Sequence, residues 1–251
     1  MEVVNVKFDW RTALLIAIIS MLASPLHARA ALALQQSRVI FNGDKSSASL
    51  LVNNQNISAP YLAQGWIEDE AGRKVRRPLL VLPPLQRIEP GASSQVKIQA
   101  LPDANLLRQD RETLFYINLR EIPPRNDHPN TFNIALQNRI KLFYRPAALK
   151  APPGELASSW LSQLVLEKQG QSWRISNPSA YYVTLVEARG FSGFSPLMLA
   201  PGASAPLPGV IGNYGRTPVL TYLNDYGGRP EVIFGCAETR CTVTANRVPR
   251  G

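Results

Sequence analysis

Short runs of β-branched, aromatic and aliphatic residues recur along this chain, and turn-forming residues separate them about every 8–12 residues. In the first part of the sequence these runs are Arg38–Phe41, Ala48–Val52, Pro60–Glu68, Leu79–Leu82 and Gln95–Ala100. In the last part they are Leu164–Glu167, Ser172–Ser176, Tyr181–Glu187, Val219–Leu223, Glu231–Phe234 and Thr242–Ala245. The segment Pro196–Pro208, rich in Pro, Ala and Gly, is expected to separate strands. No sustained helical apolar stripe appears beyond the N-terminus, so the pattern predicts an all-β fold of antiparallel sandwiches with few helices.

Two domains are expected from the length and from one proline-rich connection. The 251 residues are enough for two domains of ordinary size. The run Thr131–Tyr144 is the longest strand candidate, and Pro146–Pro153 after it has the composition of a stiff connector. We therefore predict a first domain at 31–146, a connector at 147–153 and a second domain at 154–251.

The N-terminus has the pattern of a cleavable export signal at residues 1–30. Lys7 and Arg11 supply positive charge, Thr12–Ala23 is a short apolar run, and Ala28–Ala30 is a small-x-small cleavage site. The alternative is a membrane anchor, but the apolar run falls short of the roughly 20 residues that a membrane span needs. We expect cleavage after the last of these alanines and export of the mature chain.

The chain is basic, with a formal net charge of +9 at pH 7. A basic balance often indicates a nucleic-acid partner. Export argues against that partner, so the sequence predicts no nucleic-acid binding. The positive charge could instead favour acidic polypeptides or a carboxylate terminus.

Cys236 and Cys241 are the only cysteines, and they flank a short turn between two strand-like arms. In an exported chain this spacing favours a disulfide across a hairpin. A zinc site needs about four ligands, and neither His27 in the signal nor His128 in a polar loop could complete one. We therefore predict a disulfide, with no metal and no cofactor.

The most distinctive motif is LRQDRETLFYINLREIPP at Leu107–Pro124. Its run Thr113–Leu119 favours a strand, and the two closing prolines, which cannot donate a backbone hydrogen bond, should end it. Three polar residues, Asn118, Arg120 and Glu121, stand in an otherwise apolar segment. This pattern resembles the signature of the periplasmic pilus-assembly chaperones, the PapD-like family.

The resemblance extends over nearly all of the mature chain. Its other segments, in order, are PYLAQGWIE at 60–68, PPLQRIEPG at 83–91, IALQNRIKLFYRPAALK at 134–150, YYVT at 181–184 and YLNDYGGRP at 222–230. One departure is Arg108, where the family usually has proline, and it concerns the local shape of a loop. The resemblance implies two immunoglobulin-like domains in an L-shaped arrangement with a cleft between them, a periplasmic location and no catalytic activity.

The resemblance also implies the partners. Chaperones of this family bind pilus subunits that lack a last strand, lend them one of their own, and deliver them to an outer-membrane usher. No small-molecule substrate is implied. The same donor edge could also pair with that of a second copy of the chain.

Three large apolar residues of the longest strand candidate match the family's donor strand, namely Phe132, Ile134 and Leu136. The alternative is that they pack inside the chain's own sandwich. Side chains alternate along a strand, so without a bulge the opposite face carries Arg139, Lys141, Phe143 and Arg145.

Two sets of charged residues match positions with known roles in the family. Arg38 and Lys141 match the cations that hold the C-terminal carboxylate of a subunit through charge-assisted hydrogen bonds. The alternative for either residue is a solvated strand charge. Glu112, Arg145 and Asp225 match a charged cluster between the two domains.

Two other classes of exported protein could share some of these features. A two-domain adhesin or structural pilus subunit would also be all-β, but the motif ending at Pro124 argues against it. An exported hydrolase is disfavoured because the chain has no G-x-S-x-G motif and the mature part has a single histidine. The sequence therefore predicts a chaperone without enzymatic activity.

Overall fold

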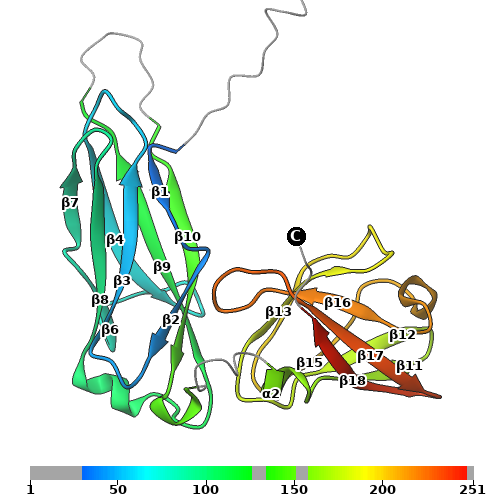
Figure 1. Ribbon diagram of the computed structural model, residues 1–251. Helices are drawn as coiled ribbons and strands as arrows, with labels where there is room; N and C mark the ends of the chain where they lie inside the picture. Colours follow the sequence, from blue (N-terminus) through cyan, green and yellow to red (C-terminus); the bar gives the residue numbers. More distant parts are fainter. Residues whose placement is uncertain (1–29, 126–133, 151–157, 248–251) are drawn as a thin grey trace, which may run out of the picture. The chain divides into compact units, whose positions relative to one another are not determined.

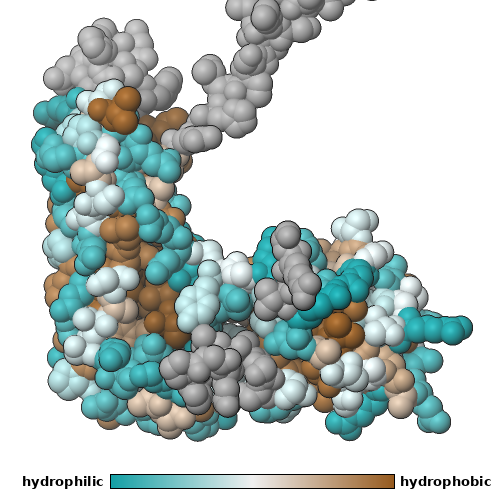
Figure 2. All heavy atoms as spheres, in the orientation of Figure 1, coloured by the Kyte–Doolittle hydropathy of each residue, from teal (hydrophilic) through white to brown (hydrophobic). Residues whose placement is uncertain are grey.

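The structure is a computed structural model that describes residues 30–125, 134–150 and 158–247. These residues form two β-sandwiches, one on each side of residue 150 (Figure 1). The prediction of an all-β fold with two immunoglobulin-like domains is confirmed. Hydrophilic residues cover much of the face drawn in Figure 2, and apolar residues gather over part of the first sandwich.

The first sandwich has two sheets. One has the order β1 (Leu32–Leu34), β3 (Ser47–Asn54), β8 (Ser93–Ala100), β6 (Leu79–Leu82). The other has the order β2 (Arg38–Asn42), β10 (Gln137–Arg145), β9 (Thr113–Ile122), β4 (Tyr61–Asp69), β5 (Lys74–Val75), and β7 (Leu85–Ile88) also pairs with β4. A single apolar core lies between the sheets.

Alternation along β9 shows how the sequence produces these two faces. Phe115, Ile117 and Leu119 belong to the buried core. The residues between them, such as Tyr116 and Asn118, therefore point to the outer face of the sheet. Alternate side chains of this strand therefore pack in the core, and the side chains between them are available for polar contacts.

The N-terminal segment contributes to both sheets. Its first part, β1, pairs antiparallel with β3, and its second part, β2, pairs parallel with β10. The parallel register places Arg38 directly beside Lys141. This crossing from one sheet to the other brings together two cations that are about a hundred residues apart in sequence.

The second sandwich is one continuous hydrogen-bonded series of eight strands. Their order is β14 (Leu197–Leu199), β13 (Val183–Ala188), β16 (Val219–Tyr222), β17 (Glu231–Ala237), β18 (Arg240–Arg247), β11 (Val165–Gln169), β12 (Ser172–Ser176), β15 (Ser204–Pro206). The series encloses one core, because buried residues from both of its ends belong to the same apolar cluster. Strand β18 joins the two halves of the series, because it pairs with β17 on one side and with β11 on the other.

The prediction of one long strand over Thr131–Tyr144 is wrong in part. Strand β10 begins at Gln137, and the described residues Ile134–Leu136 are not in a strand. The longest described strand is β9, with 10 residues against 9 in β10. A β-strand needs a hydrogen-bonded neighbour, and the ladder between β9 and β10 ends at the pair Arg120 and Gln137.

A further difference concerns short strands. The segment Pro196–Pro208 contains β14 and β15, strands of three residues that each pair on one side only. Edge strands this short carry too few apolar residues to stand out in a proline-rich sequence. Helices are few, as expected: α2 (Ser158–Leu161) and short 3-10 turns at Pro102–Leu106, Ala147–Leu149 and Ile211–Tyr214.

Some predictions fall outside the described residues. The export signal, apart from Ala30, lies there, as do Phe132 and the last part of the proposed connector, residues 151–153. The domain boundaries stay predictions.

Candidate functional site

Arg38 and Lys141 lie side by side at the start of the parallel ladder between β2 and β10. Arg38 is buried, and its Nη1 donates a hydrogen bond to the backbone oxygen of Leu223 at 3.2 Å. Its buried Nε has no acceptor among the described residues. A cavity of about 450 Å³ borders Arg38, and its lining includes Arg145 from the first sandwich and Asp225 from the second.

The electrostatic setting of these two cations favours an added anion. Burial lowers the pKa of Lys141, and the charge of Arg38 lowers it further. Burial also lowers the pKa of Arg38, although Asp225 and Glu112 act in the opposite direction. A carboxylate placed between the two cations would relieve their repulsion and could accept charge-assisted hydrogen bonds from both.

The structure brings Glu112, Arg145 and Asp225 into one ion network. Arg145 Nε lies 2.8 Å from Glu112 Oε1, and its Nη1 and Nη2 contact the two Asp225 oxygens at 2.7 and 2.9 Å. Glu112 Oε2 accepts a hydrogen bond from the backbone N–H of Tyr182 at 2.7 Å. Burial acts to lower the pKa of Arg145, but the two carboxylates together raise it. The network links β10 and the residue before β9 to two segments of the second sandwich.

Aromatic side chains surround this network, and the sequence analysis did not identify them. Phe143 is buried and packs on Tyr182, with ring centroids 5.3 Å apart. The guanidinium of Arg145 lies 5.7 Å from the ring centroid of Trp160 and 5.2 Å from that of Tyr181. The tyrosine pair of the YYVT segment was the available signal. These contacts bury the outer face of β10 at its C-terminal end.

The predicted donor residues are exposed where the structure describes them. Ile134 is 71% exposed and Leu136 is 38% exposed, and neither belongs to the buried core. This exposure favours the donor interpretation over the alternative in which the two side chains pack inside the chain's own sandwich. Leu142 and Tyr144 of β10 do face the core. If β10 were extended in a complex, alternation would place Ile134 and Leu136 on that same face but beyond the end of the core.

Part of β10 has an unpaired edge next to these residues. On one side β9 pairs with Gln137–Tyr144, whereas on the other side β2 pairs only with Lys141–Arg145. Within the described strands, Gln137–Ile140 therefore has a backbone edge without a strand partner. An unpaired edge is a template for the addition of another strand. It runs from the exposed apolar residues toward Arg38 and Lys141.

The polar residues of the distinctive motif make contacts on both faces of the sheet, and Asn118 and Arg120 share Gln137 as a hydrogen-bond partner. Asn118 accepts a hydrogen bond from Gln137 Nε2 at 2.9 Å on the outer face of the sheet. Arg120, on the same face, lies over the ring of Trp66. Glu121 faces the other way, and its carboxylate accepts a hydrogen bond from the backbone N–H of Leu32 at 2.9 Å.

A second network on the outer face was also missed by the sequence analysis. Glu68 accepts hydrogen bonds from Trp66 Nε1 at 2.9 Å and from Arg139 Nε at 3.0 Å. The guanidinium of Arg139 also stacks 3.4 Å from the ring centroid of Tyr116. Pairings across three strands were needed to bring these residues together, and their separation in sequence hides them.

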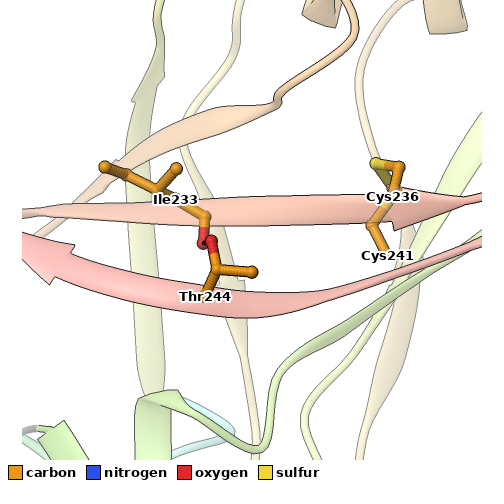
Figure 3. Close-up of a disulfide and its surroundings, with 4 residues drawn as sticks. All are labelled: Ile233, Cys236, Cys241 and Thr244. Atoms are coloured by element: carbon orange, nitrogen blue, oxygen red, sulfur yellow. Dashed lines mark hydrogen bonds between the residues drawn. A yellow bond between two sulfur atoms is a disulfide. The ribbon is translucent and has the colours of Figure 1, made fainter.

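Cys236 and Cys241 form a disulfide across the hairpin of β17 and β18 (Figure 3). They are directly opposite one another in the ladder, and a side-chain hydrogen bond from Thr244 to the backbone oxygen of Ile233 crosses the same two strands. Among the described residues, no group of three His, Cys, Asp or Glu could hold a metal ion. No helix in the described part of the chain is long and apolar enough to cross a membrane.

Comparisons with known proteins give family matches over both sandwiches. The family model described as the pili and flagellar-assembly chaperone, PapD N-terminal domain, matches residues 31–150. The model of the pili assembly chaperone PapD, C-terminal domain, matches residues 159–234. The chaperone protein PapD of Escherichia coli is 47% identical over 223 residues, which cover 86% of this chain and 91% of that protein.

Solved structures show the same fold. The periplasmic chaperone SfaE has a TM-score of 0.65 and 27% identity, and the match covers 82% of this chain and all of that chain. A structure of the Salmonella enterica SafA pilin in complex with the SafB chaperone also has a TM-score of 0.65, with 26% identity and coverage of 82% and 95%.

Proposed function

The chain belongs to the PapD family of pilus-assembly chaperones and has a chaperone role in pilus assembly; from this premise we propose that it captures pilus subunits in the periplasm by lending them a strand. One observation carries the proposal. The unpaired edge of β10 has exposed apolar residues before it and two adjacent cations after it. Both family models are chaperone models, so the alternative of an adhesin or structural subunit is not favoured.

In strand addition, the unpaired backbone edge of β10 and the exposed apolar side chains before it would have different roles. The backbone groups of Gln137–Ile140 would pair with an edge strand of the subunit, extending the ladder. Ile134 and Leu136 would enter the groove left by the strand that the subunit lacks. Their removal from water supplies apolar stabilisation, while the ladder satisfies backbone groups on both chains.

Arg38 and Lys141 would bind the C-terminal carboxylate of the subunit. A backbone ladder alone leaves a strand free to slip by two residues, whereas a carboxylate held at one end sets the register. The ion network of Arg145 would keep the second sandwich attached beside this anchor. In this proposal the protein has no catalytic residues and no cofactor, and it passes its subunits to an outer-membrane usher.

The test replaces Arg38 and Lys141 by alanine, singly, with Lys97→Ala as the matched control. Lys97 is an exposed lysine of β8 on the first sandwich. Loss of one partner of a buried charge pair typically costs about 2–5 kcal/mol of binding free energy. We expect both site variants to lose copurifying pilus subunits, and the control to retain them, with thermal unfolding confirming that each variant is folded.

A second experiment, with peptides, tests the role of the subunit's C-terminal carboxylate separately. C-terminal peptides of a copurified subunit are compared in free-acid and amidated forms for binding to wild-type protein. The anchor predicts that amidation weakens binding to wild type more than it weakens binding to Lys141→Ala, in which only Arg38 remains. Equal binding of both peptides to the wild-type protein would reject the carboxylate assignment.

A further inference from the structure

Glu121 places a carboxylate on the core-facing side of β9, where the neighbouring residues are apolar. It continues the core-facing series of β9 after Phe115, Ile117 and Leu119, and it pairs across the sheet with buried Ala63. The residue is only 5% exposed. A buried carboxylate is strongly unfavourable unless it has a cation or several hydrogen bonds.

The described contacts of this carboxylate include no cation. Its Oε2 accepts one hydrogen bond, from the uncharged backbone N–H of Leu32. None of the ion pairs between described residues involves Glu121. The carboxylate therefore lies buried beside the backbone of a residue near the predicted start of the mature chain.

We infer that Glu121 binds the α-ammonium group of Ala31 once the export signal has been removed. Hydrolysis of the Ala30–Ala31 peptide bond by a signal peptidase adds the hydroxyl of water to the carbonyl carbon of Ala30. The amine left on Ala31 takes up a proton. A free α-amino group has a pKa of about 7.7–8.0, so it is mostly charged at neutral pH. The inference rests on the predicted cleavage site.

The geometry around Ala31 suits this role. The residue is buried, and its backbone oxygen accepts a hydrogen bond from the N–H of Gln55 at 2.7 Å. The nitrogens of adjacent residues are separated by one Cα and one carbonyl carbon, so they are no more than about 4 Å apart. The new ammonium group therefore forms within a few ångströms of the Leu32 N–H that already contacts Glu121.

Leu32 and Glu121 also make hydrogen bonds with residues around the start of β10. The backbone oxygen of Leu32 accepts a hydrogen bond from Asn138 Nδ2 at 3.2 Å, and the backbone N–H of Glu121 donates to the oxygen of Leu136 at 2.9 Å. In Figure 1, β1 lies beside β10. Removal of the signal would thus add a charge pair to the part of the sandwich from which the exposed apolar residues extend.

The experiment first determines the N-terminus of the exported protein by mass spectrometry and then the pKa of its α-amino group by NMR of isotopically labelled alanine. The variants are Glu121→Gln, which keeps an acceptor for Leu32 but removes the charge, and Glu70→Gln, an exposed control. We expect an α-amino pKa raised by about 1 unit or more in wild type and in the control, and no such rise in Glu121→Gln.

A second arm adds one glycine before Ala31, which moves the ammonium away from the carboxylate. The extension should lower the denaturation midpoint of wild type and of Glu70→Gln, but not that of Glu121→Gln. Any N-terminus other than Ala31, or a wild-type α-amino pKa within the ordinary range, would overturn the inference. The α-amino pKa of the wild-type protein and the effect of the added glycine on its denaturation midpoint are measured without a substitution at Glu121. The test therefore holds even if Glu121→Gln does not fold.

Discussion

In the proposed function, Lys141 is the residue whose ionisation should depend most directly on subunit binding. Burial and the neighbouring Arg38 lower its pKa from the ordinary value of 10.5 in the free protein. A bound carboxylate would raise that pKa, because an opposite charge favours the ammonium form. Between the pKa of Lys141 in the free protein and its pKa in the complex, binding is accompanied by the uptake of a proton. Affinity should therefore fall as the pH rises through this window, by up to about tenfold per pH unit, and should be constant below it.

Isothermal titration of a subunit peptide against pH checks this prediction, with Lys141→Arg as the matched variant. Arginine keeps its charge throughout the range, so its affinity should not decline in the window that begins below 10.5. An identical decline in wild type and variant would show that the titrating group is not Lys141.

Single residues also show where sequence reasoning reaches its limit. The polar character of Asn118, Arg120 and Glu121 was visible, but their directions and partners were not. Glu121 contacts a backbone group 89 residues away. Such pairs depend on which strands become neighbours, and composition and spacing do not specify that. The roles of Arg38 and Lys141 came from the family resemblance and stay predictions.

At the scale of elements, the segment before β10 offers the sharpest mutational test. Ile134→Asp should leave the free protein almost as stable as wild type, because this side chain is 71% exposed. In a complex the same carboxylate would be buried in the subunit without a partner, which is strongly unfavourable. We therefore expect a folded variant that does not retain subunits, measured by urea unfolding and by copurification on the same preparation.

Leu142→Asp is the matched control for this test. Leu142 lies on the core-facing side of β10 and is fully buried, so a carboxylate there should cost several kcal/mol and unfold the first sandwich. If Ile134→Asp also unfolds, the segment packs against the free protein and the donor assignment is wrong. If Ile134→Asp still retains subunits, Ile134 is not a principal contact.

Strand β10 shows which features of a strand its sequence pattern can predict. The alternation from Gln137 to Arg145 was predicted with the correct faces, because Leu142 and Tyr144 point into the core. The predicted start was wrong, because alternation continues through Ile134–Leu136 although the ladder with β9 ends at Gln137. A pattern shows the capacity for a strand, whereas a partner decides whether it forms.

For the whole molecule, turn spacing, chain length and the proline-rich connection were enough to predict two β-sandwiches but not the contacts between them. The three charged residues of the ion network are separated by 33 and 80 positions along the chain. Nothing in the local sequence around Glu112 or Asp225 identifies Arg145 as their shared partner. Only the resemblance to a family suggested the set, and the described contacts of Arg145 with both carboxylates supply its geometry.

Asp225→Asn tests how far this network couples the two sandwiches. The change removes the charge that holds two nitrogens of Arg145, while Glu112 remains in place. Because the Asp225 side chain is 20% exposed, we expect a loss of about 1–3 kcal/mol, smaller than for a fully buried pair. Asp103→Asn, which breaks the exposed pair with Arg77, should cost about 1 kcal/mol or less.

Hydrogen exchange followed by mass spectrometry gives separate readings for the two sandwiches along a urea series. In wild type, peptides from β9 and from β16 should lose protection together, because the buried Arg145 network stabilises both parts. In Asp225→Asn the two transitions should separate, whereas in Asp103→Asn they should stay together. Coincident transitions in Asp225→Asn would mean that the remaining contacts between the sandwiches, among them the aromatic contact between Phe143 and Tyr182 and the hydrogen bond from Tyr182 to Glu112, are sufficient for coupling. The charge of Asp225 would then have no necessary part in it.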